Sequence, residues 1–277
     1  MSLIIRNNDN ANRPIVDAAS PHLPDVYFNR IRLSAGESLT LEVPGFECVV
    51  VVQTGRCEVL VGDTEFHGIG GRADIWSGKA DSVYTGTRQP FTVIATADLE
   101  AVVAGGACTE AHAPFRVTSD EVESVVVGSS DTKSRREIFH ILGQNANGRA
   151  GNLLVSELYA EDGCWAGYPP HKHDTDRGGE TNHAELYHYR FNPPSGFGGQ
   201  FHYHADGTPE AVMTLDGDTY LLPSGYHPTV TSPGHRAYVF TILVGRDQRG
   251  LVQYFDPVHE HLTDYIPGLG AMRDKFK

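Results

Sequence analysis

Short stretches in which apolar and polar residues alternate dominate the chain. They include FECVVVVQTG, CEVLVGDTEF, FTVIATADLEAVVAGG, NLLVSELYA, ELYHYRF, GDTYLLP and AYVFTILVG, with Gly, Pro, Asn and Asp between them. Alternation with a period of two is typical of strands, and the spacing of three or four that marks a helix is almost absent. The pattern predicts an all-β protein.

The chain length favours two β domains over one. A chain of 277 residues is generous for a single sandwich or barrel. An internal echo points the same way: residues 217–227 (GDTYLLPSGYH) and 78–86 (GKADSVYTG) share a frame, with Tyr84 in the place of Pro223 and Thr87-Arg88 where His227 would fall. A repeated domain whose first copy lacks the histidine would give this match, and so would two unrelated glycine-rich turns. We expect residues 105–134, rich in turn residues and charges, to cross between the halves.

The histidines concentrate in the second half of the chain, where ten of the fourteen follow residue 170. His171 and His173 are two residues apart, which places both imidazoles on one face of a strand. Glu185 opens the next strand-like segment, with Tyr187 and Tyr189 on its side. His227 follows a tight Pro-Ser-Gly-Tyr turn.

Three imidazoles and one carboxylate suit a divalent first-row ion such as zinc, manganese, iron or nickel, with positions left open for water or substrate. The sequence therefore predicts a metal site made of His171, His173, Glu185 and His227. A histidine pair of this spacing on its own is more often an exposed polar loop. Because Glu185 and the later His227 complete a set of four ligands, a metal site is the favoured interpretation.

The overall charge and the cysteines narrow the class of protein. A net charge of −13 makes a nucleic-acid or anionic-membrane partner improbable, because such surfaces need concentrated Lys and Arg. The N-terminal segment has no secretory signal pattern and no apolar run is long enough for a membrane span, so we expect a cytoplasmic protein. The four scattered cysteines are expected to be buried and reduced.

Three blocks of sequence resemble a known family: YPPHKHD (168–174), ELYHYRFNPPSGFGGQ (185–200) and PSGYHP (223–228). They are similar to the 5-deoxy-glucuronate isomerases of myo-inositol catabolism, which are related to the 5-keto-4-deoxyuronate isomerases and belong to the cupin superfamily of small metal-binding barrels. The resemblance implies a bicupin of two jelly-roll barrels. Residues 1–118 would form a degenerate barrel without metal, and residues 119–277 a barrel with the metal and the active site.

The resemblance also implies an aldose–ketose isomerisation of a sugar acid, a reaction of carbohydrate metabolism. A proton shuttle for it needs a group of suitable pKa near the substrate, and the catalytic candidates are Tyr187, Tyr189 and His202. The candidates for substrate binding are Tyr168, Lys172, Gln200 and Arg249. Each tyrosine has an equally good interpretation as a packing residue of the barrel. Because unpaired sheet edges tend to be covered, we expect a homo-oligomer.

Other functions fit the same ligands. The substrate could be a different uronate, such as 5-keto-4-deoxyuronate. An iron-dependent cupin dioxygenase would use the same three histidines and glutamate, and metal identity and oxygen consumption would distinguish it. A non-enzymatic sugar-binding bicupin, in which the metal only braces the barrel, is the third hypothesis.

Overall fold

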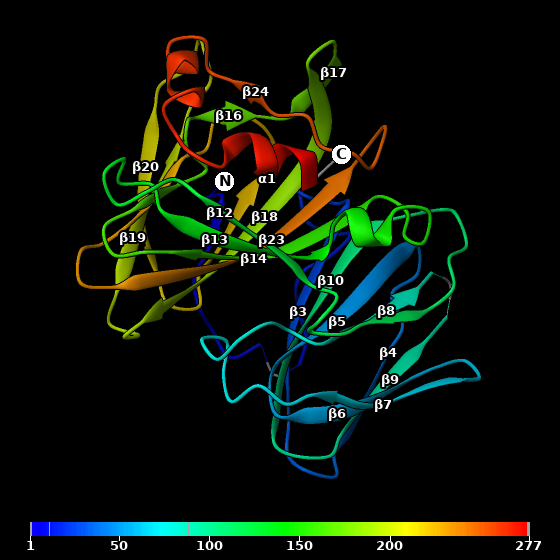
Figure 1. The fold of residues 1–277 in the computed structure, drawn as a ribbon. Coiled ribbons are helices and arrows are strands. Elements are labelled where there is room, and N and C mark those ends of the chain that lie inside the picture. The colour runs from blue at the N-terminus through cyan, green and yellow to red at the C-terminus, as the bar shows by residue number, and fades with distance from the viewer. Residues whose placement is uncertain (1, 11, 88, 276–277) are drawn as a thin grey trace. The chain divides into compact units, whose positions relative to one another are not determined.

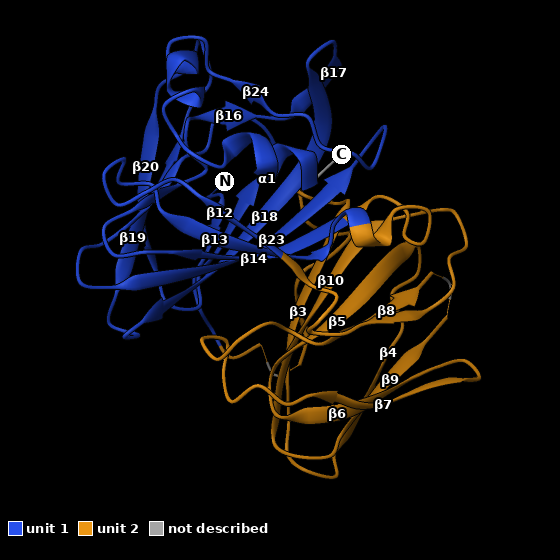
Figure 2. Ribbon diagram, in the orientation of Figure 1, with its two compact units in different colours: residues 1–8, 124–144, 154–277 blue, residues 9–123, 145–153 orange. Residues whose placement is uncertain are grey.

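A computed structural model describes residues 2–10, 12–87 and 89–275 (Figure 1). The chain forms two compact units (Figure 2), and each is built mainly of antiparallel strands. Unit 1 comprises Met1–Asn8, Ser124–Gln144 and Leu154–Lys277, and unit 2 comprises Asp9–Glu123 and Asn145–Leu153. A single division after residue 118 would place three segments in the other unit: Met1–Asn8, residues 119–123 and Asn145–Leu153. Strand β1 (Ile4–Ile5) pairs with a strand of unit 1, and backbone N–H groups of residues 151–153 donate to a carboxylate of unit 2.

Unit 2 consists of two sheets that enclose an apolar core. The larger sheet has the order β11-β8-β5-β10-β3-β2 and the smaller one the order β4-β9-β6-β7. Alternate residues of both sheets supply the core, among them Val50, Ile31, Val59 and Val93, all with no exposed surface. The strands are β2 (Pro14–Val16), β3 (Val26–Leu33), β4 (Ser38–Leu41), β5 (Phe46–Thr54), β6 (Arg56–Val61), β7 (Thr64–Gly70), β8 (Ser82–Gly86), β9 (Phe91–Ala95), β10 (Leu99–Ala107) and β11 (Phe115–Val117).

Unit 1 repeats this plan. Its larger sheet has the order β1-β21-β18-β23-β14-β13-β12, with β17 paired to β18, and its smaller sheet has the order β15-β22-β19-β20. The strands of the larger sheet are β12 (Glu123–Val127), β13 (Arg136–Leu142), β14 (Leu153–Ala160), β17 (Asp174–Arg177), β18 (Glu180–Asn192), β21 (Thr219–Leu222) and β23 (Arg236–Gly245), besides β1. Those of the smaller sheet are β15 (Trp165–Ala166), β19 (Phe197–His202), β20 (Glu210–Leu215) and β22 (Thr229–Thr231).

One end of unit 1 is covered by its last residues. Strand β16 (His171–Lys172) pairs with β24 (Tyr254–Phe255), and the short helix α1 (Leu269–Lys275) lies near them (Figure 1). Leu269 and Met272 of α1 pack with Phe255 and with Leu243 of β23 in one apolar cluster. Two 3₁₀ turns complete the elements, η1 (Gln144–Ala146) and η2 (Glu260–Thr263).

The two larger sheets have equivalent strand orders, which accounts for the internal echo. In unit 2, β5 lies between β8 and β10, and in unit 1, β18 lies between β21 and β23. The echoed segments 78–86 and 217–227 therefore each contain a strand, β8 or β21, and the two strands occupy the same position in their sheets. Gly86 and Gly225 both adopt positive φ, +73° and +86°, where a side chain would be strained. Arg88, the residue in the histidine position of the first copy, lies outside the described residues.

The all-β prediction is confirmed, and each of the seven alternating stretches forms strands. The predicted crossover, residues 105–134, is less irregular than expected because it contains β11 and β12. The four cysteines are buried and unbridged, as predicted. None of the helices in the described part of the chain has the length and apolar character needed to span a membrane.

Candidate metal centre and active site

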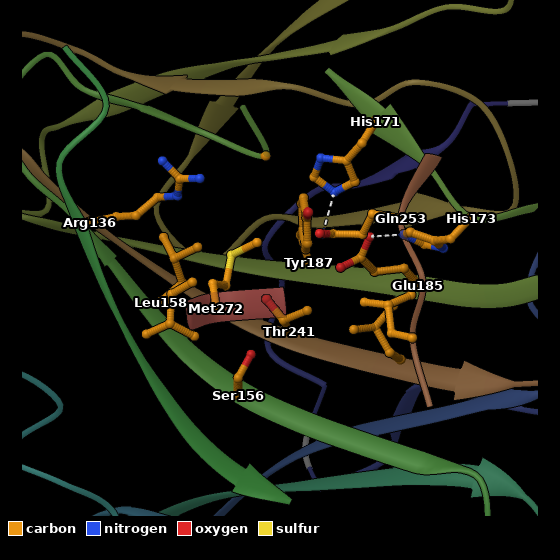
Figure 3. Close-up of a pocket in the computed structure, with 14 residues that line it drawn as sticks. Arg136, Ser156, Leu158, His171, His173, Glu185, Tyr187, Thr241, Gln253 and Met272 are labelled. Atoms are coloured by element: carbon orange, nitrogen blue, oxygen red, sulfur yellow. Dashed lines mark hydrogen bonds and ion pairs between the residues drawn. The ribbon is translucent and has the colours of Figure 1, made fainter. Parts of the chain in front are cut away.

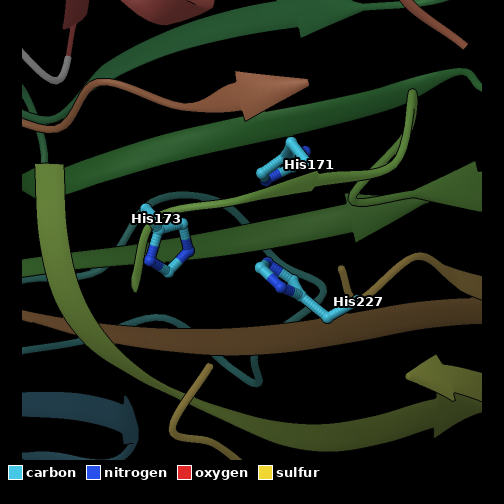
Figure 4. A group of neighbouring side chains, drawn as sticks. All are labelled: His171, His173 and His227. Atoms are coloured by element: carbon cyan, nitrogen blue, oxygen red, sulfur yellow. The ribbon is translucent and has the colours of Figure 1, made fainter. Parts of the chain in front are cut away.

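Three histidines converge in unit 1 (Figure 4). One ring nitrogen from each of His171, His173 and His227 lies within 4.8 Å of the others, and all three side chains are buried. The His227 ring centroid is 5.0 Å from those of both His171 and His173. These are the three histidines that the sequence predicts as ligands.

Different elements bring the three side chains together. His171 lies in β16, where it pairs with Phe255 of β24, and His173 follows two residues later. His227 follows the turn that Gly225 closes. The turn is held by Asp174, whose carboxylate accepts a hydrogen bond of 2.7 Å from the Gly225 N–H. The H-x-H strand and the later turn thus share a direct contact.

The backbone fixes the orientation of each imidazole. The Nδ1 atoms of His171, His173 and His227 lie 3.0, 3.2 and 2.8 Å from the carbonyl oxygens of Pro169, His183 and Gly225. Since a carbonyl only accepts, each Nδ1 carries the proton, and Nε2 is left with its lone pair. A metal ligand needs this tautomer.

Glu185 completes the cluster from the centre of β18. Its Oε2 lies 3.0 Å from Nε2 of His173 and 3.1 Å from Nε2 of His227. A carboxylate oxygen and two nitrogens bearing lone pairs repel one another unless a cation, either a proton or a metal ion, lies between them. The donor set, three imidazoles and one carboxylate, therefore fits a divalent transition metal.

The electrostatics of the cluster agree with a site that attracts positive charge. Burial alone would raise the pKa of Glu185, but a proton shared with Nε2 of His173 or His227 stabilises the carboxylate more strongly, and the pKa falls below its usual value. Burial lowers the pKa of His171 well below its usual value, and the neighbouring His227 and His173 lower it further. The group is therefore ready to exchange a shared proton for a metal ion.

The cluster lines a cavity of about 40 Å³ in unit 1 (Figure 3). His171, His173 and Glu185 form part of the wall, and apolar side chains such as Leu243 and Met272 form much of the rest. The polar groups of the wall are Arg136, Ser156, Tyr187, Thr241 and Gln253. This cavity gives the candidate metal centre a shielded space in which a small polar molecule can bind.

Tyr187 and Tyr189 lie on the same side of β18 as Glu185, as predicted, but their hydroxyl groups differ in position. Tyr187 lines the cavity beside Glu185, and burial together with that carboxylate raises the pKa of its hydroxyl well above the usual value. Tyr189 donates to Gln200 of β19, at 2.6 Å, and its hydroxyl is 3.3 Å from that of Thr229. The structure brings Tyr187 to the cluster and places Tyr189 in the core between the sheets.

Gln200 and His202 lie beside the turn that positions His227 in the candidate metal site. The amide nitrogen of Gln200 donates to the carbonyl oxygens of Phe201, His227 and Pro228, at 2.8, 3.0 and 3.3 Å, so its donors are used within the protein. His202 Nε2 lies 2.6 Å from the carbonyl oxygen of Ser224. Both residues fix the turn that carries His227, and neither belongs to the wall of the cavity as described.

The other predicted substrate-binding residues also have partners within the protein. The Lys172 ammonium group forms ion pairs with Asp174 and with Glu180, the latter at 2.8 Å. The Tyr168 ring is tilted by 46° against that of Trp165, with 5.6 Å between ring centroids. Arg249 offers its backbone carbonyl to His183 Nε2 at 3.1 Å. Among the described residues that form the cavity wall, none of these three appears.

The sequence analysis missed Arg136 and Gln253. Arg136 begins β13 on the buried face that also carries Ile138, a basic residue at an apolar position, and this break in the pattern is a usable signal. Gln253 lies in a short irregular segment before β24 without such a signal. Its amide nitrogen is 3.0 Å from His171 Nε2, so the amide must turn away when that nitrogen binds a metal.

Comparison with known proteins identifies the family of the chain. The model of the KduI/IolB family matches residues 3–262, almost the whole sequence. The chain belongs to the KduI/IolB family. This confirms the resemblance predicted from the three sequence blocks.

Relatives with assigned names agree with the family. The chain is 29% identical over 252 residues to the 5-deoxy-glucuronate isomerase of Bacillus velezensis, covering 90% of this chain and 92% of the relative. It is 28% identical, over 90% of this chain and 91% of the relative, to a protein of the same name from Listeria monocytogenes. The relatives are isomerases by name, and this KduI/IolB chain matches them over nearly their full length.

Solved structures confirm the predicted bicupin fold. An IolB-like protein from Salmonella typhimurium superposes with a TM-score of 0.84 at 29% identity, covering 95% of this chain and all of that one. A variant of the oxalate decarboxylase of Bacillus subtilis superposes with a TM-score of 0.58 at 12% identity, covering 91% of this chain and 78% of that one. The second likeness concerns the fold alone.

Proposed function

We propose that this KduI/IolB protein is a metal-dependent aldose–ketose isomerase that converts 5-deoxy-glucuronate to 5-dehydro-2-deoxy-gluconate in myo-inositol catabolism. The observation that carries the proposal is the cavity of unit 1, whose wall holds Tyr187 together with His171, His173 and Glu185 of the buried histidine–glutamate cluster. Similarity over nearly the whole chain to relatives named 5-deoxy-glucuronate isomerase supports the choice of substrate.

His171, His173, Glu185 and His227 are the residues that would hold the metal, as their Nε2 and carboxylate atoms face one another. The chemistry that a divalent ion supplies at such a site is Lewis-acid polarisation of a carbonyl oxygen. Zinc, manganese, iron and nickel all fit this donor set. A cytoplasmic location and a homo-oligomeric state stay predictions from the sequence.

Tyr187 is the residue we assign to proton transfer. The isomerisation moves one proton between adjacent carbons and another between the oxygens attached to them. Burial and the neighbouring Glu185 raise the pKa of Tyr187 well above its usual value, so its hydroxyl keeps its proton at neutral pH. It can therefore hold a proton near a substrate oxygen and act as a general acid.

The remaining wall excludes water and adapts to the substrate. A cavity of about 40 Å³ has room for a few water molecules, less than a six-carbon sugar acid needs. Part of the wall must therefore move when substrate enters. Met272 on α1 is the most adaptable of these side chains, because methionine is unbranched and flexible.

The proposal is tested by incubating metal-loaded protein with 5-deoxy-glucuronate and with 5-keto-4-deoxyuronate, and following loss of the aldehyde signal by NMR. We expect turnover of 5-deoxy-glucuronate. Absence of turnover with either compound, in protein shown to contain metal, would refute the isomerase function. Oxygen consumption in the same samples distinguishes a dioxygenase.

The metal site is tested separately by the metal content of His171→Ala and His227→Ala. Both variants should lose the ion, since each removes one of three converging imidazoles. His67→Ala is the matched control, because His67 lies in β7 of unit 2 with its side chain 60% exposed. Unchanged metal content in both test variants would rule out the proposed ligands.

A further inference from the structure

Arg136 is a buried arginine that shares a cavity with the candidate metal ligands. It begins β13, and only 2% of its surface is exposed. Figure 3 shows its guanidinium on one side of the cavity wall, with His171, His173 and Glu185 on the other. An arginine at this depth requires an explanation, because arginine is rarely buried without a partner.

Arg136 has no carboxylate partner among residues 2–10, 12–87 and 89–275, the part of the chain that is described. Its Nη1 donates to the carbonyl oxygen of Ser134 and its Nη2 to that of Tyr168, each at 2.8 Å. Carbonyl groups satisfy individual N–H donors but leave the positive charge uncompensated. A guanidinium carries five N–H groups, so donors remain for a ligand.

Other arginines of unit 1 and unit 2 contrast with Arg136. Arg116 pairs with Asp81 at 2.5 Å, and Arg135, one residue before Arg136, pairs with Glu161 at 2.6 Å. These side chains are partly exposed, so a partner is less necessary for them. Among these three arginines, the most deeply buried guanidinium is the one that lacks a carboxylate.

The charge on Arg136 persists despite its burial. Burial lowers the pKa of Arg136 to about 10, which still leaves the side chain protonated at neutral pH. An uncompensated charge in an apolar wall costs free energy in the empty protein. An anion that enters the cavity would remove this cost, and the low dielectric of the surroundings would strengthen the attraction.

The rest of the wall favours an anion that also carries hydroxyl groups. Ser156 and Thr241 present hydroxyls to the cavity, and Gln253 presents a buried amide whose Oε1 has no hydrogen-bond partner in the described structure. These groups can donate to and accept from the hydroxyls of a sugar. The wall thus provides, in one space, a cation, neutral polar groups and the histidine–glutamate cluster.

We propose that Arg136 binds the carboxylate of the sugar acid substrate and so directs its carbonyl end toward the cluster of His171, His173, Glu185 and His227. The identity of the substrate in this inference rests on the proposed function. A guanidinium can hold a carboxylate through two parallel hydrogen bonds, which fixes orientation as well as affinity. Arg136 would therefore select acids over neutral sugars.

The first test compares an acid with its neutral analogue. In Arg136→Gln, we expect kcat/KM for 5-deoxy-glucuronate to fall about thirtyfold or more, the usual effect of losing one partner of a buried charge pair. With 5-deoxy-glucose, which has a hydroxymethyl group in place of the carboxylate, kcat/KM should stay the same. Arg135→Gln is the matched control and should keep the wild-type preference, because Arg135 pairs with Glu161 outside the cavity wall.

The second test measures binding without turnover. Calorimetric titration with D-glucuronate should show weaker binding to Arg136→Gln than to the wild type, with D-glucose as the neutral control. Arg136→Lys, which keeps a charge but not the planar fork, should give intermediate affinity and also serves if the glutamine variant does not fold. Metal content is measured in every variant, because the Tyr168 carbonyl that Arg136 holds lies near His171.

The outcomes separate the two proposals. If the wild type turns over no uronate, the proposed function fails, and the glucuronate titrations still decide whether Arg136 binds a carboxylate. If the wild type is active and both Arg136 variants, folded and loaded with metal, keep the wild-type preference for the acid and the wild-type affinity for D-glucuronate, the inference is overturned.

Discussion

Both units bury a glutamate on the central strand of the larger sheet, and the two carboxylates have opposite surroundings. Glu47 in β5 of unit 2 accepts hydrogen bonds from the Tyr84 hydroxyl at 2.6 Å and from backbone N–H groups of Gly151, Asn152 and Leu153 at 2.8, 2.5 and 2.9 Å. Glu185 in β18 of unit 1 instead faces two imidazole nitrogens. Glu47 is surrounded by hydrogen-bond donors and holds a loop in place. Glu185 is surrounded by nitrogen lone pairs and is stable only with a cation between them.

The equivalent positions of the two sheets show what distinguishes the units. Glu185 pairs with Leu222 of β21 and Leu243 of β23, and in unit 2 the matching residue is Val50, which pairs with Val83 of β8 and Val103 of β10. Val50 belongs to the closely packed core of that unit. One side chain on the central strand therefore marks the difference between a packed barrel and a candidate metal centre.

The connection before the central strand is the second difference. In unit 2, β4 ends at Leu41 and β5 begins at Phe46, so only residues 42–45 intervene. In unit 1, residues 167–179 separate β15 from β18, and they carry His171, His173 and the strands β16 and β17. The longer connection is what delivers two of the three histidines to the mouth of the barrel.

The largest effect is expected when Glu185 of unit 1 is replaced by valine, the residue at the equivalent position of unit 2. Glu185→Val should lower metal affinity by more than about 10–100-fold, the range for losing a mere supporting group, and abolish isomerase activity. The metal-free protein should stay folded, because replacing a buried charged group by an apolar one is often neutral or stabilising. Metal analysis and thermal unfolding test both parts. Retained metal at wild-type affinity would contradict the assignment of Glu185.

The reverse change belongs to the same prediction. Val50→Glu places an unpaired carboxylate in the apolar core of unit 2 and should destabilise the protein by about 3–5 kcal/mol. Val126→Glu is the matched control, since Val126 is 43% exposed, and its effect should stay within about 0.5 kcal/mol. Equal stability of the two variants would show that the core of unit 2 tolerates a carboxylate at the position equivalent to Glu185.

The two tyrosines of β18 give the next largest effect. Tyr187→Phe should reduce kcat by about 10²–10⁴, the usual contribution of general acid–base catalysis, and leave the metal content unchanged. Tyr189→Phe removes hydrogen bonds to Gln200 and Thr229 and should cost about 1 kcal/mol of stability, with kcat little changed. Steady-state kinetics with metal-loaded variants decide the matter. Similar losses of kcat in both variants would remove the distinction between them.

The tyrosines also show how far the sequence could predict the site. Alternation places Tyr187 and Tyr189 correctly on the face of Glu185, because the period of a strand is a local property. Which hydroxyl reaches the cavity depends on the position of the residue along β18. Tyr187 lies at the cavity, whereas the hydroxyl of Tyr189 meets Gln200 of the opposite sheet. Sequence pattern predicts the face of a side chain but not its position within the barrel.

Arg136 shows the other limit. Thirty-five residues separate it from His171, and β13 reaches the cavity only through the order of strands in the larger sheet. The strands themselves, and the histidines with their glutamate, could be predicted because each is marked by a local pattern or a short motif. Contacts that depend on strand order need the fold, which is why the sequence predicts Arg249, 22 residues after His227, for substrate binding instead.

The smallest effect on activity is expected at the carboxylate of unit 2. Glu47→Gln keeps the size of the side chain but removes its charge and turns one acceptor into a donor that faces backbone N–H groups. Burial and the neighbouring carboxylate raise the pKa of Tyr84, so its hydroxyl remains a donor to Glu47. Since hydrogen bonds to charged groups contribute about 1.5–3 kcal/mol, we expect a loss of that order in urea unfolding.

Metal content and kcat of the folded Glu47→Gln variant should match the wild type, because the carboxylate of unit 2 is saturated by donors. Glu58→Gln is the control within the same unit, since Glu58 is 35% exposed in its side chain and its contact with His67 lies at the surface. Its stability should change by no more than about 0.5 kcal/mol. A loss of metal in Glu47→Gln at unchanged stability would contradict the assignment of a purely structural role to Glu47 and of metal binding to Glu185.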